Sequence, residues 1–152
     1  MNDIADLAKH VETLWVNYRR LTGRELIVTG TDAVDVAGLL ADAPFAVVSH
    51  GVQDDPVFNY GNNLALKLFE MTWDEFTALP SRQSAEAPDQ VERTRLLDQV
   101  SRQGYVDNYS GVRISKSGRR FMIKNATVWN LFDADGEYYG QAALIRDWET
   151  LP

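Results

Sequence analysis

The chain has 152 residues, of which 45% are hydrophobic and 24% charged, as is typical of a single globular domain with its own core. Its net charge of −7 argues against direct nucleic-acid binding, because backbone phosphates repel an acidic surface. The lack of cysteine excludes disulfides, thiolate metal sites and cysteine-linked flavins or chromophores.

The sequence shows no sign of a membrane or export segment. Its first residues lack the basic and then apolar layout of a signal peptide. No apolar run approaches the roughly 20 residues that span a bilayer. We therefore expect a cytoplasmic protein that does not contact a membrane.

Residues 3–22 are predicted to form an amphipathic helix that stops at Gly23. Their apolar side chains recur at helical spacing, which indicates a face that packs on the protein's own sheet. We treat residues 1–23 as this helical unit and residues 24–43 as a connector with a short helix at 32–40. A homodimer through the helix and the adjacent strands is compatible with this interpretation.

Two strands and three helices are predicted next. The strands are residues 44–50 and 56–60, and the helices are residues 64–71, 73–79 and 88–103. Residues 61–63 are expected to cap the first of these helices. Thr72 and Glu75 have the spacing of a capping box for the second.

Residues 104–148 are predicted to form three antiparallel strands joined by turns at 115–118 and 133–136, each ending on glycine. The middle strand is apolar at odd and at even positions. Strict alternation would place the odd positions on one face of the sheet and the even positions on the other. The odd positions are Phe121, Ile123, Thr127, Trp129 and Leu131, and the even positions are Met122, Ala126, Val128 and Phe132. Each face of the sheet therefore needs a cover.

These elements predict an α+β fold with a five-stranded antiparallel sheet. The helices between residues 63 and 103 would cover one face, and the N-terminal helix would cover the other. The domain proper would be residues 44–148, with 149–152 as a tail.

This order of elements resembles the PAS domain, a sensor and interaction module. Nine short motifs in order narrow the resemblance to the PAS-like MEKHLA family, over roughly Leu21 to Trp148. They are Ser49-His50-Gly51, Asp55-Pro56, Asn59-Tyr60-Gly61-Asn62, Leu79-Pro80-Ser81-Arg82, Ser84-Ala85-Glu86, Gly111-Val112-Arg113-Ile114, Gly118-Arg119-Arg120-Phe121, Ala126-Thr127-Val128-Trp129-Asn130 and Gly140-Gln141-Ala142-Ala143.

The MEKHLA family includes free-standing bacterial proteins and the C-terminal domains of certain plant homeodomain–leucine zipper transcription factors. The hexapeptide that names the family is absent here, which places the chain with the bacterial type. The resemblance implies a PAS-like fold and a role in sensing or protein interaction. It supplies no catalytic residue.

PAS-like domains often hold a ligand between the sheet and the connecting helices, and the cofactor is left unassigned here. Haem is not expected, because His10 and His50 both lie outside the helical connection. A non-covalent flavin or another small organic molecule stays open.

His50 is either a residue that ties a turn or a ligand-binding or pH-responsive group near Asp54 and Asp55. These three residues also have the atom types of a metal site, but they lack a recognisable ligand spacing. Asn59, Tyr60 and Asn62 would serve as cap and turn residues or line the mouth of a pocket.

Arginines offer a second group of candidates. Arg82, Arg113, Arg119 and Arg120 could converge if the loop at 80–87 folds over the sheet. They would then pair with Glu86, Asp107 or Asp147, or hold a carboxylate- or phosphate-bearing ligand.

Trp129 and Gln141 complete the candidate ligand residues. Trp129 would pack in the core or line an aromatic pocket. The ligand set is thus His50, Asn59, Tyr60, Asn62, Arg82, Arg113, Arg120, Trp129 and Gln141.

An enzyme is not expected, because the chain has no nucleophile elbow, P-loop or dinucleotide fingerprint. Ser49 and His50, as neighbours on a strand, point to opposite faces and cannot act as nucleophile and base. We predict a sensory or interaction domain with a small-molecule or protein partner. The alternatives are a small-molecule-binding α+β enzyme, such as an isomerase or hydrolase, and a scaffold without a cavity.

Overall fold

The computed structural model describes residues 4–27, 33–85 and 87–152. Helices α1 (Ile4–Thr22) and α2 (Ala33–Ala41) precede strands β1 (Ala46–His50) and β2 (Phe58–Gly61). The connection holds α3 (Asn63–Phe69), α4 (Trp73–Phe76), the 3-10 helix η1 (Ser81–Ser84) and α5 (Ala87–Gln103). Strands β3 (Tyr105–Ile114), β4 (Arg120–Phe132), β5 (Tyr138–Ile145) and β6 (Asp147–Thr150) follow. The predicted α+β class and element order are confirmed.

The sheet is antiparallel, with strand order β2-β1-β5-β4-β3 and with β6 paired to β4. It has six strands rather than the predicted five, because the last strand is interrupted at Arg146. Thr127 lies opposite Leu144 and Ile123 opposite Trp148, so β6 continues the register of β5 along β4. Residues 149 and 150, predicted as a tail, therefore belong to the sheet.

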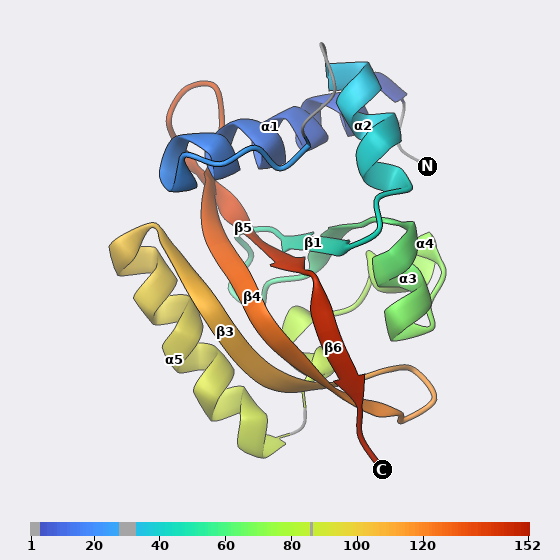
Figure 1. The fold of residues 1–152 in the computed structure, drawn as a ribbon. Helices are drawn as coiled ribbons and strands as arrows, with labels where there is room; N and C mark the ends of the chain where they lie inside the picture. Colours follow the sequence, from blue (N-terminus) through green and yellow to red (C-terminus); the bar gives the residue numbers. More distant parts are fainter. Residues whose placement is uncertain (1–3, 28–32, 86) are drawn as a thin grey trace.

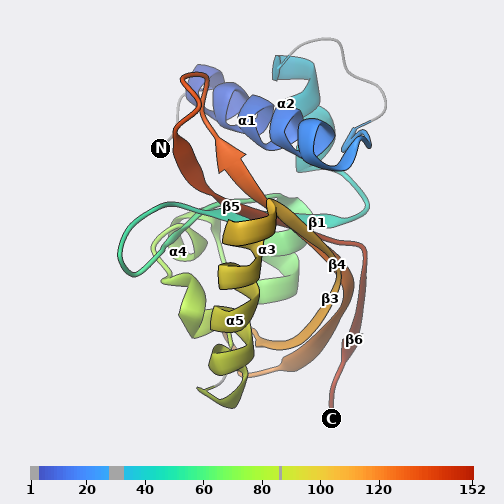
Figure 2. The same cartoon turned by 90° about the vertical axis from the view of Figure 1, so that its left-hand side faces the viewer.

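The sheet separates two groups of helices, as the prediction required (Figures 1 and 2). On one face, Val11 and Leu14 of α1 pack with Trp129 and Leu131 of β4. On the other, α3 and α4 pack with β1, β2 and β4, and α5 adds Leu96 and Val100 against β4.

The segment 24–43 is more than a connector. Val36 and Leu40 of α2, together with Leu26 and Ala43, are buried in the cluster beneath α1. Two elements therefore cover this face, where the sequence analysis expected α1 alone.

A bulge at Asn125 changes the alternation along β4. Asn125 has a φ of 53°, and Asn108, on the paired strand β3, has a φ of 60°. The β3–β4 register slips on each side of Tyr109, so one extra residue on each strand restores the pairing. As a result Phe121 and Ile123 share a face with Ala126, and not with Trp129 as strict alternation predicted.

The predicted caps and turns are present. Asn62 caps α3 by accepting a hydrogen bond from the Ala65 amide, and Thr72 and Glu75 form the capping box of α4. The β3–β4 turn docks on these helices, since both Ser115 and Ser117 donate to the Glu70 carboxylate. These hydrogen bonds lower the pKa of Glu70 to about 2.

Among residues 4–27, 33–85 and 87–152, no helix is long and apolar enough to cross a bilayer.

Candidate functional site

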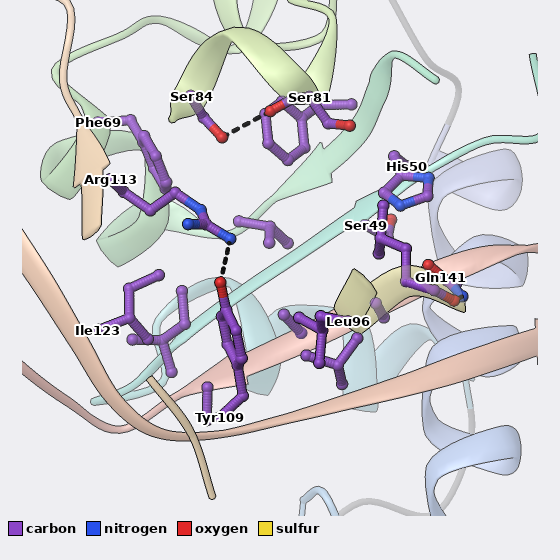
Figure 3. A pocket seen from close by; sticks show the side chains of 18 residues that line it. Ser49, His50, Phe69, Ser81, Ser84, Leu96, Tyr109, Arg113, Ile123 and Gln141 are labelled. Carbon is purple, nitrogen blue, oxygen red and sulfur yellow. Dashed lines mark hydrogen bonds between the residues drawn. The ribbon is translucent and has the colours of Figure 1, made fainter. Parts of the chain in front are cut away.

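A cavity of about 70 Å³ lies between the sheet and the helices of the connection (Figure 3). One water molecule needs roughly 10–15 Å³ of such space, so the cavity has room for a small organic molecule. The walls come from the sheet strands β1 to β5 on one side and from α3, η1 and α5 on the other. They are mainly apolar, and include Phe58, Phe69, Leu96, Ile123, Val128 and Ile145.

Polar side chains enter this apolar space from several directions. Figure 3 shows Arg113 and Tyr109 meeting at one end of the cavity. His50 and Gln141 lie at the other end. Ser84 lines the cavity from η1, where its hydroxyl donates to the carbonyl of Ser81 at 2.7 Å.

Arg113 is buried, with 7% of its surface exposed. Its guanidinium donates to the Val112 carbonyl at 2.9 Å and to the Tyr109 hydroxyl at 3.0 Å. The Arg113 guanidinium also lies over the Tyr109 ring, 5.5 Å from its centre. β3 positions both groups, because their spacing of four residues places them on one face of the strand.

Gly111 makes room for this pair. A Cβ at position 111 would lie 2.3 Å from the Tyr109 hydroxyl oxygen and 3.3 Å from Arg113 Nη1. A residue with a side chain would therefore displace the Tyr109 hydroxyl from Arg113. The missing side chain is a local requirement of the site.

Gln141 closes the opposite end through hydrogen bonds to the neighbouring elements. Its amide nitrogen donates to Asn130 Oδ1 at 3.0 Å and to the Leu97 carbonyl at 3.3 Å. Asn130 in turn donates to the Val100 carbonyl at 3.0 Å. These bonds join β4 and β5 to α5 and close the cavity on that side.

A second polar network lies on the α1 face of the same sheet. His10 of α1 contacts the Tyr139 hydroxyl through Nδ1 at 2.8 Å and Ser49 Oγ through Nε2 at 3.0 Å. Ser49 donates its hydroxyl proton to Asn59 Oδ1. His10 Nε2 must then carry the proton that it shares with Ser49, and Nδ1 accepts from Tyr139.

Burial sets the charge of this histidine. It lowers the pKa of His10 to about 4, so the ring is neutral at pH 7. Burial also raises the pKa of Tyr60, whose ring packs against His10. Because Nε2 donates to Ser49, His10 does not act as a base toward that hydroxyl, and Ser49 is buried.

Comparison with known proteins agrees with the geometry. The sequence model of the MEKHLA domain matches residues 8–150. The chain belongs to the MEKHLA domain family. The family expectation from the motifs is thereby confirmed.

Two plant homeobox-leucine zipper proteins contain segments similar to this chain. Homeobox-leucine zipper protein HOX9 of Oryza sativa subsp. japonica is 24% identical over 143 residues, covering 90% of this chain and 17% of the rice protein. ATHB-14 of Arabidopsis thaliana is 24% identical over 96 residues, covering 63% of this chain and 11% of that protein. The chain thus spans about a sixth or less of these relatives.

Solved PAS and light-oxygen-voltage structures share the fold of this MEKHLA domain. A PAS domain from Colwellia psychrerythraea superposes with a TM-score of 0.63 at 16% identity, over 73% of this chain and 92% of that one. The light-state dimer of the fungal blue-light photoreceptor Vivid gives 0.57 at 16% identity, over 85% and 88%. An RNA-binding light-oxygen-voltage receptor gives 0.62 at 16% identity, over 72% and 31%. The PAS-like fold is confirmed.

Three of the nine candidate ligand residues line the cavity of the MEKHLA domain. They are His50, Arg113 and Gln141. His50 also contacts the Gly51 carbonyl through Nδ1 at 3.0 Å, which is the turn-tying contact considered from the sequence.

The other six lie elsewhere. Tyr60 and Trp129 are buried in the cluster beneath α1. Asn59 accepts a hydrogen bond from Ser49. The Asn62 side chain caps α3 by accepting from the Ala65 amide, and it donates to the Leu40 and Phe45 carbonyls. Arg82 and Arg120 are exposed at the surface.

The four arginines do not converge. Arg82 pairs with Asp55 at 3.0 Å, and Arg119 reaches the Leu68 carbonyl at 3.5 Å. Asp107, a predicted partner, instead accepts from Arg24, which lowers the pKa of Asp107. The predicted partner Glu86 lies outside the described residues. Within the described ranges, no cluster of three or more histidine, aspartate or glutamate residues could hold a metal.

Tyr109 and Ser84 line the cavity but were not among the nine candidate ligand residues predicted from the sequence. A signal for Tyr109 was available, because positions 109, 111 and 113 share one face of a strand and the glycine between two long side chains lets them meet. Ser84 lies on a 3-10 turn within a segment that was predicted as loop, so its direction could not be inferred.

Proposed function

We propose that this MEKHLA domain is a sensory module that binds a small organic molecule in the cavity between the sheet and α3, η1 and α5. The observation that carries the proposal is the cavity itself, which is mainly apolar and has a few convergent polar groups, as is typical of ligand sites. A scaffold with a filled core is less consistent with such a space. We propose no catalytic role and expect action in the cytoplasm.

Strand β4 offers a route from the cavity to the surface. Ile123, Ala126 and Val128 of β4 line the cavity. On the opposite face, Trp129 Nε1 donates to the Leu14 carbonyl of α1 at 3.3 Å. A ligand that shifts β4 would therefore alter the packing of α1, and α1 would present the change to a partner chain.

The outer side of α1 is polar and would suit a partner surface that carries polar or charged groups. Its apolar stripe is already used on the sheet, whereas Asp6, Lys9 and Glu12 are exposed. The expected homodimer would therefore use this polar side of the helix with the adjacent strands. The Vivid structure is a dimer, which supports testing self-association.

Xenon binding tests the cavity, because an apolar cavity admits xenon without specific contacts. Ala143 lines the cavity from β5, so Ala143→Leu should fill it. Ala78, exposed after α4, provides the matched control Ala78→Leu. We expect a saturable ¹²⁹Xe shift in wild type and in Ala78→Leu, and at least a several-fold weaker one in Ala143→Leu. Equal xenon binding by all three proteins, or none by wild type, contradicts the proposal.

Hydrogen exchange tests the coupling to α1. Because Ala143→Leu mimics a permanently occupied cavity, it should change amide exchange in α1 relative to Ala78→Leu. Unchanged exchange throughout α1 in a variant that no longer binds xenon would show that the cavity does not communicate with this helix.

A further inference from the structure

Arg113 is the one buried arginine among the described residues. Other arginines with described acidic partners, such as Arg24 with Asp107 and Arg82 with Asp55, are about half exposed. Arg113 makes hydrogen bonds only to a carbonyl and a hydroxyl within the described ranges, with no carboxylate partner. A permanently charged group is thus buried beside a cavity without a described counter-ion.

Such a charge is costly unless an anion compensates it. Arginine keeps its proton in proteins, so it cannot become neutral as a buried lysine can. Burial removes much of its hydration, and the attraction of a hydrogen-bonded carboxylate offsets part of that cost. The site therefore favours an anion that enters the cavity.

The pair of Arg113 and Tyr109 still has hydrogen-bond donors to offer. A guanidinium has five N–H groups, and the two hydrogen bonds that Arg113 makes to described residues use two of them. Tyr109 accepts from Arg113, which leaves its own O–H proton free to be donated to a ligand oxygen. The absence of a side chain at Gly111 keeps these groups together.

The other walls of the cavity indicate the chemical character of the part of the ligand that does not contact Arg113. Beyond this end, the cavity is bordered mainly by aliphatic and aromatic side chains, including Leu96, Ile123 and Val128. An inorganic phosphate or another multiply charged anion would leave charge against those walls, with a single cation to balance it. A singly charged carboxylate with an apolar body satisfies both parts of the site.

We propose that the cavity binds a small monocarboxylate whose carboxylate is held by Arg113 and Tyr109 and whose apolar body fills the space toward Gln141. This inference rests on the proposed function, because it names the ligand class of the same cavity. Arg113 would be the residue that makes the cavity prefer an anionic ligand over a neutral one.

Benzoate and benzamide test the inference, because they share a shape and differ in charge. Titration calorimetry at pH 7.5 should give benzoate at least tenfold tighter binding than benzamide to wild type. Arg113→Met should weaken benzoate binding at least tenfold and change benzamide binding less than threefold. Tyr109→Phe, which keeps the ring, should weaken benzoate binding by a smaller factor. Arg119→Met, at an exposed arginine, is the matched control and should bind as wild type does.

Stability separates a binding role from a structural one. Because Arg113 has no described carboxylate partner, Arg113→Met without ligand should unfold at the wild-type temperature or above it. If Arg113→Met does not fold, the Tyr109→Phe titration still tests the anion site. Benzamide bound as tightly as benzoate, phosphate bound more tightly than benzoate, or benzoate binding that survives Arg113→Met, overturns the inference.

The two proposals fail in different ways. Xenon binding by wild type without a preference for benzoate would leave the cavity function standing and remove the monocarboxylate. No xenon binding and no benzoate binding would remove both.

Discussion

Stability of the domain should fall between pH 7 and pH 5 because of His10. Burial lowers its pKa from 6.5 to about 4. Between these values the unfolded chain binds a proton at His10 and the folded chain does not. A falling pH therefore favours the unfolded state. The contribution of neutral His10 to the free energy of unfolding is lost progressively below pH 6.5.

The size of the effect follows from the two pKa values. Proton linkage at this one site should lower the free energy of unfolding by about 2 kcal/mol between pH 7 and pH 5. For a domain of this size that corresponds to a fall in the melting temperature of roughly 4–8 °C. The carboxylates with lowered pKa values, such as Glu70, titrate mostly at lower pH and add little in this interval.

Urea unfolding of wild type and His10→Gln at pH 7, 6 and 5 measures the effect. His10→Gln lacks this titrating ring but keeps His50, so it should lose about 2 kcal/mol less than wild type over the interval. Tyr139→Phe removes the hydroxyl that contacts Nδ1 but keeps the histidine, so it should retain most of the pH dependence. Equal losses in wild type and His10→Gln would refute the assignment of this titration to His10.

Further predictions concern the glycines, the N-terminal helix and self-association. Gly140→Ala should lower the free energy of unfolding by more than about 2 kcal/mol, because φ is 150° and the new Cβ would lie 2.1 Å from the His50 carbonyl oxygen. Gly38→Ala, in an exposed turn of α2 with open space around the new Cβ, should instead raise it by about 0.5–1 kcal/mol in the same urea titration. Deletion of residues 1–22 should uncover the face around Trp129 and cause aggregation; a soluble, folded truncation seen by circular dichroism and light scattering would contradict this. Light scattering of the intact protein at high micromolar concentration should give twice the chain mass, and a strict monomer would rule out the homodimer.

The fold could be predicted from the sequence to the level of elements and layers. Apolar residues on both faces of the segment 120–132 correctly required a cover on each side. The Asn125 bulge could not be foreseen, because asparagine at positive φ gives no distinct pattern within an apolar strand. The predicted number of strands was wrong because the last predicted strand is divided at Arg146 into β5 and β6. The two pieces keep one register along β4, so the apolar pattern of the sequence does not reveal the break.

The site was harder to predict, because its members meet only in three dimensions. Arg113 and Gln141 were chosen from sequence and lie at opposite ends of the cavity. Trp129 could have faced either side of β4, and the bulge decides that it packs under α1. His10 was considered only as a haem ligand, whereas its contact with Ser49 spans 39 residues of sequence and depends on how α1 crosses the sheet.

The proposed monocarboxylate would lie in the cavity with its charged end on Arg113. A crystal structure of the protein with 4-bromobenzoate tests this placement most directly, because the bromine marks the ligand by its anomalous signal. We predict a bromine peak inside the cavity toward Ala143 and Gln141, with the carboxylate within hydrogen-bond distance of Arg113 and Tyr109. Bromine found only on the surface, or a ligand in the cavity with its carboxylate turned away from Arg113, would contradict the account.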